Sequence, residues 1–414
     1  LELWELCRFA HDHMYSIYSC LRRYNLIAVK YCQFMIYDFQ KIPFQHIVKF
    51  GQRTMLSSPL FSTSWILGRF CNYSCSYCWP YARSNTKDHR PTELCTATID
   101  EIKRQARENG FNSFHFSLSG GEPTFHPGYL DIMKHLSDDA HNTNYTSVHM
   151  TSNCSRPMKW FETYVEYAKP FHRASITASL HTEHVNTPEK MQDFADKLIY
   201  CQEHDVQVTI NMVMRPEHFE DDWTNSLFFH EQNINVTLKP QSDPTASRVV
   251  DGYTEDMLQR LYNGMPQRAY TEAKRVWSDR PKPNFKMDKE SEHYKEHASV
   301  PWHMQIEFRD KQGKAWYMDQ AERFNAFNFN NFKGWSCSSG FRSIIIREPD
   351  GSIKRSYSCH DAPLGNIETG FKLFDKPQLC TTPACVSSAD SKIPKRVPGT
   401  PVALYPGDTS WKDE

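Results

Sequence analysis

The sequence predicts an α/β fold, in which a partial (β/α)6 TIM-like barrel is followed by a small α+β domain. From about residue 62 to residue 241, strand-like and helix-like segments alternate, which is typical of βαβ units and a parallel sheet. After Pro240 this alternation ends, and from residue 301 the hydrophobic period falls to two. At 414 residues, the chain has room for two domains or for one large barrel with an appendage.

Six predicted strands form the barrel, with amphipathic helices between them; they span 63–69, 112–118, 146–151, 174–180, 206–213 and 235–239. One helix is predicted to begin at Thr98, because Thr98 and Glu101 are spaced as a capping box, and to end at Gly110. Another is predicted to have Thr187 as its N-cap and Pro188 as its first residue, before apolar residues at helical spacing.

The second half of the chain is predicted to hold a connector, a hairpin region and a tail. The turn at 310–313 and the turn at 349–351 each separate two segments with strand periodicity, which indicates two hairpins. The last 25 or so residues are rich in Pro, Ser and Lys. The predicted domains are an N-terminal extension (1–60), the barrel (61–245), a helical connector (246–300), an auxiliary domain (301–390) and a tail (391–414).

Net charge, hydrophobic segments and cysteine count together argue against several classes of protein. The formal net charge of −1 provides no global field for a polyanion, which argues against nucleic acid as the main partner. No segment reaches the roughly 18 uninterrupted apolar residues of a membrane span, and the first 50 residues lack the order of a secretory signal. The 13 cysteines are odd in number and unevenly spaced, unlike a secreted disulfide scaffold. We therefore expect a cytoplasmic protein with no membrane segment, whose clustered thiols serve metal or redox chemistry.

Three cysteines follow the first predicted strand in the string CNYSCSYC: Cys71, Cys75 and Cys78. A loop can bring such closely spaced thiolates to one metal cluster. Iron–sulfur cubanes are typically held by four thiolates, so three thiols with no fourth nearby would leave one iron open to another ligand. The alternative is a zinc site or three incidental cysteines, although a closed zinc site normally has four protein ligands.

Residues 60–245 resemble the radical S-adenosylmethionine (SAM) superfamily, in which a CxxxCxxC loop after the first barrel strand holds a SAM-cleaving [4Fe–4S] cluster. The resemblance implies that Tyr77, before the last cysteine, packs on the adenine. The second predicted strand ends in a string that resembles the superfamily's GGE motif: Ser119, Gly120, Gly121, Glu122 and Pro123. The glycines would let the backbone approach the SAM methionine, and Glu122 would help to set the charge there. Two glycines after a strand are also common as a simple turn.

The same resemblance assigns further SAM-binding residues. Ser152 or Asn153, after the third strand, and Ser179, at the end of the fourth, would contact the ribose. Met212 on the fifth strand would flank the adenine. For each of these residues, the alternative interpretation is barrel packing or a turn.

A second group of cysteines lies in the hairpin region: Cys337, Cys359, Cys380 and Cys385. Their arrangement resembles the twitch/SPASM C-terminal domain of radical SAM enzymes. The resemblance implies one auxiliary [4Fe–4S] cluster with all four ligands from the protein. The alternatives are four ordinary cysteines and a structural zinc bound by the four thiolates.

The resemblance implies an enzyme that cleaves SAM to methionine and a 5′-deoxyadenosyl radical, which abstracts hydrogen from a peptide or small-molecule substrate. His181 and Lys239, after the fourth and sixth strands, would reach that substrate, and a flavodoxin- or ferredoxin-type reductant would be the partner. We expect an oxidative outcome, with the auxiliary cluster as electron acceptor. The alternatives are a redox-neutral epimerase or rearrangement enzyme, a non-catalytic iron–sulfur electron carrier and a zinc-stabilised interaction protein.

Overall fold

The computed structural model of the chain describes nine segments: residues 42–52, 60–87, 89–244, 248–265, 306–318, 329–347, 350–359, 361–385 and 387–400. Most of the predicted N-terminal extension lies outside the described residues. The same is true of residues 266–300 of the predicted connector.

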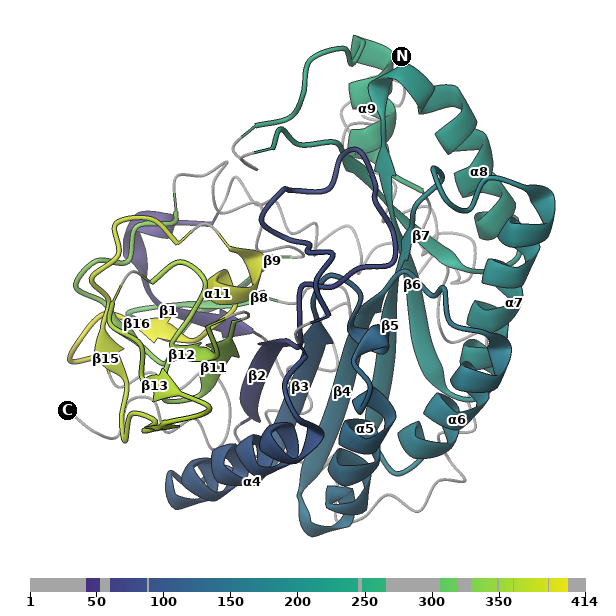
Figure 1. Cartoon of the computed structure of the whole chain (residues 1–414). Coiled ribbons are helices and arrows are strands. Elements are labelled where there is room, and N and C mark those ends of the chain that lie inside the picture. Colours follow the sequence, from purple (N-terminus) through teal and green to yellow (C-terminus); the bar gives the residue numbers. More distant parts are fainter. Residues whose placement is uncertain are drawn as a thin grey trace, which may run out of the picture.

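Six parallel strands form the centre of the larger sheet, and their order in it follows their order along the chain. These strands are β2 (Leu60–Ile66), β3 (Ser113–Ser119), β4 (Tyr145–Ser152), β5 (Arg173–Leu180), β6 (Val206–Met214) and β7 (Asn235–Pro240). Helices follow the strands (Figure 1): α4 (Thr92–Glu108), α5 (Tyr129–Asp138), α6 (Met158–Ala168), α7 (Pro188–Glu203), α8 (Phe219–Glu231) and α9 (Glu255–Asn263). This alternation confirms the predicted α/β fold, with a parallel sheet arranged as in part of a (β/α) barrel.

The helix α7 begins as its sequence predicts. The hydroxyl of Thr187 accepts a hydrogen bond from the backbone N–H of Lys190 at 3.3 Å, and Pro188 is the first helical residue. The apolar face of the helix, which includes Phe194 and Leu198, is buried against the sheet. Capping and periodicity therefore agree in this helix.

The predicted start of α4 is wrong. The helix begins at Thr92, and Thr98 lies inside it, where the Thr98 hydroxyl donates a hydrogen bond to the backbone carbonyl of Leu94 at 2.7 Å. A threonine hydroxyl can bond the carbonyl four residues earlier in a helix, so its position relative to Glu101 did not mark an N-cap. The predicted end is right, because Gly110 follows the helix with a φ of 85°.

Alternation along the parallel strands separates an apolar face from a polar one. In β6 the even-numbered residues from Val206 to Met214 are buried, while the odd-numbered residues are half-buried. The buried face packs against the helices in one hydrophobic core. The other face is turned away from the helices and carries mostly hydroxyl, imidazole and amide groups: Ser64, Ser117, Ser119, His149, Thr151, Ser175, Thr177, Ser179, Thr209 and Asn211.

The second predicted hairpin extends this sheet. Strands β11 (Ser343–Ile346) and β12 (Ser352–Lys354) pair antiparallel, which confirms the hairpin. Strand β11 also pairs parallel with β2, and β13 (Gly365–Asn366) and β14 (Gly370–Phe371) continue the sheet beyond β12. The hairpin is thus joined to the barrel strands by a continuous ladder.

A smaller sheet contains six short strands, in the order β15 (Gln378–Leu379), β10 (Ser336–Cys337), β16 (Lys395–Arg396), β1 (Ile47–Gln52), β8 (Ile306–Asp310) and β9 (Ala315–Met318). Strands β8 and β9 pair antiparallel, which confirms the first predicted hairpin. The helix α11 (Ser388–Ser391) precedes β16. Strands β1 and β16 lie side by side although they come from opposite ends of the chain (Figure 1). Residues 395–396 are therefore inside a sheet, although the composition of 391–414 predicts a tail.

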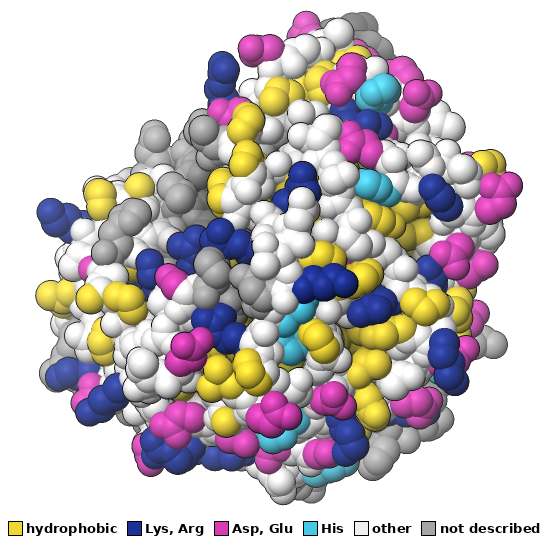
Figure 2. Space-filling view, in the orientation of Figure 1, with side chains coloured by type: hydrophobic (Ala, Val, Ile, Leu, Met, Phe, Trp, Pro, Cys, Tyr) yellow, Lys and Arg dark blue, Asp and Glu magenta, His cyan; other side chains and the backbone are white. Residues whose placement is uncertain are grey.

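The two sheets have separate hydrophobic cores, and the smaller one includes three of the C-terminal cysteines. On the surface shown in Figure 2, acidic and basic side chains are interspersed around the edge. Among the described helices, none is long and apolar enough to cross a membrane.

Candidate metal centres

The cysteines of the CxxxCxxC motif lie in a loop after β2. A bridge between Phe70 and Ser84 closes the base of this loop, where the N–H of Cys71 donates to the carbonyl of Ser84 at 3.3 Å. Farther along, the N–H of Cys78 donates to the carbonyl of Cys75 at 3.2 Å, which makes a tight turn. The loop follows the carboxyl end of β2, which is the end of the strands where (β/α) barrels carry their sites.

The thiols of this loop influence one another's ionisation. Burial raises the pKa of all three, and for Cys75 the negative charges of Glu183, Cys71 and Cys78 add to burial and raise it to about 12. Without a cation these thiols would stay protonated, so a positive metal centre is what would hold them as thiolates. Cys75 and Cys78 also line a cavity of about 460 Å³.

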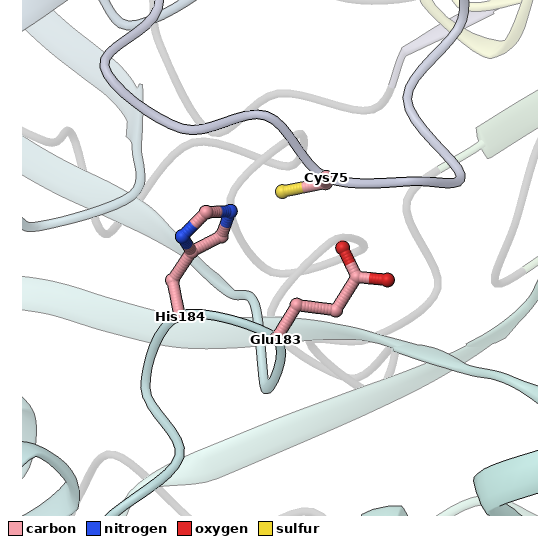
Figure 3. A group of neighbouring side chains, drawn as sticks. All are labelled: Cys75, Glu183 and His184. Carbon is pink, nitrogen blue, oxygen red and sulfur yellow. The ribbon is translucent and has the colours of Figure 1, made fainter.

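Glu183 and His184, which follow β5, lie beside Cys75 (Figure 3) and hold the backbone of the cysteine loop. His184 Nε2 accepts a hydrogen bond from the N–H of Ser74 at 3.2 Å, and the Glu183 carboxylate accepts from the N–H of Ser76 at 2.8 Å and from its hydroxyl. One potential ligand atom of each of Cys75, Glu183 and His184 lies within 4.8 Å of the others. The hydrogen bonds flank Cys75 on both sides, so Glu183 and His184 fix the position of this part of the loop.

Aromatic contacts join the same two segments. The rings of Tyr73 and His184 stack with their centroids 4.1 Å apart and an interplanar angle of 6°. The Tyr77 hydroxyl and His181 Nδ1 share a hydrogen bond of 2.8 Å. Burial, and then the charge of His184, lower the pKa of His181 to about 4, so its ring is neutral at pH 7. The predicted catalytic His181 and the predicted adenine-packing Tyr77 are therefore bonded to each other.

Arg215, which forms a buried ion pair with Asp222, also lies next to Glu183. Arg215, just after β6, lies 3.5 Å from the Glu183 carboxylate and 3.3 Å from that of Asp222. Asp222 has no exposed side-chain surface and also accepts a hydrogen bond from the Thr182 hydroxyl at 2.8 Å. The sequence analysis missed Glu183, Arg215 and Asp222. Glu183 comes soon after the predicted strand 174–180, at the end of the strands where (β/α) barrels carry their sites.

Gly120 and Gly121 are where the turn after β3 touches the base of the cysteine loop. The N–H of Gly121 donates to the carbonyl of Gly68 at 2.8 Å. A Cβ atom on Gly121 would lie 2.2 Å from the carbonyl oxygen of Arg69, and one on Gly120 would lie 2.3 Å from that of Gly68. In this structure the two glycines therefore permit contact between two stretches of backbone. From the sequence, the same glycines were expected to let the backbone approach SAM.

Glu122 is 1% exposed and joins the end of β3 to the end of β4. Its carboxylate accepts four hydrogen bonds: from the Thr124 N–H (3.2 Å) and hydroxyl (2.6 Å), the Ser152 hydroxyl (2.8 Å) and the Asn153 N–H (2.6 Å). Burial raises the pKa of Glu122, and these bonds oppose the rise. Thr124 lies in the short 3-10 helix η3 (Pro123–Phe125), so the buried Pro123 is part of the same turn.

Asn153 connects β4 to the cysteine motif. Its Nδ2 donates to Asn72 Oδ1 at 2.9 Å and lies 3.9 Å from Cys71 Sγ. The next residue, Cys154, has a φ of 53°, a left-handed conformation that is unusual for a residue other than glycine. The structure thus brings the predicted Ser152 and Asn153 together with the cysteine loop through Glu122 and Asn72.

The remaining predicted residues lie along the sheet. Ser119 and Ser179 are at the ends of β3 and β5 on the polar face, and Lys239 is exposed near the end of β7. Met212 is 1% exposed in the hydrophobic core, because it lies on the helix-facing side of β6. The structure therefore does not bring Met212 to the polar face, where its neighbour Asn211 lies instead.

The second group of cysteines converges at the smaller sheet. Cys337, Cys380 and Cys385 are buried in its core, and Cys359 is half-buried. Burial raises the pKa of Cys380, and negative charge on Cys337 and Cys359 raises it further. Burial also raises the pKa of Cys385, to about 11, with further contributions from Cys337 and Cys380. Cys380 therefore interacts electrostatically with Cys337, Cys359 and Cys385.

Comparisons with known proteins match part of this chain. The sequence model of the Radical SAM superfamily matches residues 65–229. The S-adenosylmethionine-dependent nucleotide dehydratase RSAD2 of Oncorhynchus mykiss is 26% identical over 178 residues, which are 40% of this chain and 47% of that protein. The chain thus spans about half the length of the curated relative that it matches.

Two solved structures have lower identities. Native anSMEcpe with bound AdoMet is 15% identical, with a TM-score of 0.44, 76% of this chain covered and 79% of that one. Coproporphyrinogen III oxidase (HemN) from Escherichia coli is 13% identical, with a TM-score of 0.32, 50% of this chain covered and 51% of that one.

The segment matched by the superfamily model runs from β2 to α8. It contains the cysteine loop, the turn at Gly120–Glu122, the end of β4 and the Glu183–His184 pair, whose contacts form one connected site. This connected site therefore lies inside the segment, residues 65–229, that matches the sequence model of the Radical SAM superfamily.

Proposed function

We propose that this protein is a radical SAM enzyme in which Cys71, Cys75 and Cys78 hold a [4Fe–4S] cluster with one iron open to SAM. When bound and reduced, such a cluster supplies the electron that cleaves SAM to methionine and a 5′-deoxyadenosyl radical, which abstracts hydrogen from a substrate. The observation that supports this proposal most strongly is the loop of three thiols at the carboxyl end of β2, within the matched segment.

The protein would contribute the shape of the site. Glu183 and His184 hold the loop at Ser74 and Ser76, and Asn153 approaches Cys71 Sγ. The polar face of the sheet offers hydroxyl and amide groups to the sugar and amino-acid portions of SAM, and Ser179 remains our candidate for the ribose. Tyr77 remains the candidate for the adenine, and Ser119 and the backbone at Gly120–Pro123 remain candidates for the methionine portion.

We further propose that Cys337, Cys359, Cys380 and Cys385 hold one auxiliary [4Fe–4S] cluster, as in a twitch/SPASM domain. A cluster with four protein ligands has no iron open to substrate, so it would serve as an electron acceptor. The outcome would then be oxidative, with a flavodoxin- or ferredoxin-type reductant supplying the first cluster. The competing outcome is a redox-neutral epimerisation or rearrangement.

The substrate would be a peptide or a small molecule that reaches the site from the polar face, with Lys239 near the end of β7 as a candidate contact. His181 remains a second candidate, although it is bonded to Tyr77. The name of the RSAD2 relative specifies a nucleotide, so free nucleotides are the small molecules to test first.

Anaerobic reconstitution followed by dithionite and SAM tests the first proposal. The wild-type protein should release 5′-deoxyadenosine, and a variant with Cys71, Cys75 and Cys78 changed to Ala should release none. Cys201→Ala is the matched control, because Cys201 is buried in the barrel core away from the loop, and this variant should behave as wild type. SAM cleavage by the triple variant would contradict the assignment.

Metal analysis tests the auxiliary cluster. Two cubanes require about eight irons per chain, and the triple variant should keep about four. Zinc in place of those four irons would show that the second group is a structural zinc site. Loss of two hydrogens from the substrate per 5′-deoxyadenosine would support oxidation, whereas an unchanged product mass with solvent deuterium at carbon would show epimerisation.

A further inference from the structure

A buried lysine lies among the four C-terminal cysteines. Lys395 in β16 is the direct cross-strand partner of Cys337 in β10 on one side and of Phe50 in β1 on the other. Directly opposed residues in an antiparallel pair have Cβ atoms about 4.5–5.5 Å apart. Lys395 is only 2% exposed. Its side chain therefore enters the interior of the small domain beside the cysteines.

Two hydrogen bonds to backbone carbonyls engage the ammonium group of Lys395 but do not neutralise its charge. Its Nζ donates hydrogen bonds to the backbone carbonyls of Asp390 (2.7 Å) and Ile393 (3.2 Å). It also lies 5.3 Å from the ring centroid of Phe50 and 5.1 Å from that of Phe332. Within the residues that the structure describes, no carboxylate is within ion-pair distance of this nitrogen.

The nearby carboxylate is already engaged with another segment. The Asp390 oxygens accept hydrogen bonds from the N–H groups of Tyr357 (3.1 Å) and Ser358 (2.6 Å), which precede Cys359. Asp390 thus positions the segment that carries this cysteine, while its backbone carbonyl receives Lys395. One residue of α11 therefore links the lysine to the cysteine segment on the other side of the site.

A buried ammonium without an ion-pair partner is strongly disfavoured unless negative charge lies close to it. The direct cross-strand neighbour of Lys395 is Cys337, one of the four cysteines proposed as ligands of the auxiliary cluster. A negative centre held by these cysteines would supply the charge that the buried ammonium lacks.

We propose that Lys395 is the counter-charge of the auxiliary cluster and stabilises its reduced state, an inference that rests on the auxiliary cluster proposed above. A cubane held by four thiolates is anionic, and reduction adds one more negative charge. A fixed positive charge beside a buried cluster stabilises its more negative state, because charges interact strongly at low dielectric. Lys395 would thereby make the cluster a better electron acceptor, acting as a positioning residue without ligating a metal.

The test uses the full chain with Cys71, Cys75 and Cys78 changed to Ala, so that the auxiliary cluster alone contributes. In this background, Lys395→Met removes the charge and keeps an apolar stem, while Lys395→Arg keeps the charge. Lys103→Met is the control, because Lys103 is a buried lysine of α4 that pairs with Asp139 at 2.8 Å in the barrel. Iron content and the midpoint potential are measured for each variant, the latter by a redox titration followed by electron paramagnetic resonance.

Lys395→Met should shift the reduced-to-oxidised ratio at a fixed potential at least tenfold toward the oxidised cluster, which is a midpoint lower by ~59 mV or more for a one-electron couple. Lys395→Arg and Lys103→Met should stay close to the background. Retention of iron by Lys395→Arg, with its loss from Lys395→Met, would equally show that the charge is needed. An unchanged midpoint in Lys395→Met would overturn the inference, as would loss of iron from both Lys395 variants. Absence of iron from the background protein itself would refute the auxiliary cluster instead.

Discussion

Replacing Gly121 by alanine would test why two glycines follow β3. A Cβ at this position would lie 2.2 Å from the Arg69 carbonyl oxygen and 2.5 Å from that of Phe70. Contacts shorter than 3.0 Å are essentially never seen for real Cβ atoms, so the Arg69 contact must lengthen by about 0.8 Å. Both obstacles are backbone atoms at the base of the cysteine loop, and a change of rotamer cannot relieve them.

The shift would also strain two hydrogen bonds, from the N–H of Gly121 to Gly68 at 2.8 Å and from the N–H of Glu122 to Phe70 at 2.7 Å. Overpacking a tight interior site destabilises by about 1–3 kcal/mol, and each lost hydrogen bond adds about 1 kcal/mol. If one of the two bonds is lost, we expect Gly121→Ala to reduce the free energy of unfolding by about 2–4 kcal/mol. It should also displace Cys71, so that iron content falls.

Chemical denaturation and iron analysis measure the two effects. Gly264→Ala is the control: Gly264 ends α9 with a φ of 63°, and nothing lies within 4 Å of its Cβ position. Its ψ of −171° places Gly264 in a backbone region that is essentially confined to glycine, so that variant should be destabilised by roughly 1–3 kcal/mol from backbone strain alone and should keep its iron. If Gly121→Ala retains full iron and wild-type stability but loses affinity for SAM, the backbone-contact explanation is wrong and the interpretation from sequence is right.

Three further predictions follow from contacts of the barrel. His184→Phe keeps a ring against Tyr73 but removes the acceptor for the Ser74 N–H, so this variant should retain less iron after reconstitution. His204→Phe is a control away from the loop, and equal iron in both variants would contradict the role given to His184. Glu183→Gln should retain more iron than Glu183→Ala, because an amide oxygen can still accept from the Ser76 N–H; the reverse order would rule out this anchor. Burial, and then the charges of Arg173 and Lys392, lower the pKa of His149 from 6.5 to about 4 in the folded protein. Between these pH values the unfolded chain binds more protons, so the free energy of unfolding should fall by up to about 3 kcal/mol as pH drops from 6.5 to 4. In His149→Gln the pH dependence of unfolding should be shallower, and an unchanged slope would refute this contribution.

The sequence predicted those features of the fold that depend on local patterns. All six barrel strands were placed within a few residues, since most of them alternate apolar and polar residues. The cap at Thr187 was found because its signal is confined to a few neighbouring residues. The start of α4 was missed because Thr98 satisfies its hydroxyl inside the helix, and a capping-box spacing does not distinguish the two situations.

Strand pairings between segments that are distant along the chain could not be predicted from the sequence. The two-residue strand β16 has no period of its own and is defined only by its neighbours β10 and β1. The parallel pairing of β11 with β2 joins segments that are far apart along the chain, and no local signal marks it.

Only those parts of the candidate site that carry a recognisable sequence motif were predicted. The cysteine motif and the turn at Gly120–Glu122 were found from spacing, and the structure connects them by hydrogen bonds. Met212 was assigned to the site because its strand was identified, but a shift of one residue along a strand exchanges its two faces. Glu183 and His184 were missed because they act through the backbone of another loop. Lys395 was missed because its cross-strand neighbours come from two other strands, β1 and β10.

The central claim is that the cysteine loop leaves one iron open to SAM. Electron paramagnetic resonance of the dithionite-reduced protein, with Cys337, Cys359, Cys380 and Cys385 changed to Ala to remove the auxiliary signal, tests it most directly. We predict a [4Fe–4S] signal whose shape changes when SAM is added, because the sulfonium compound occupies the iron without a protein ligand. A signal that SAM leaves unchanged, in protein with about four irons per chain, would contradict the claim.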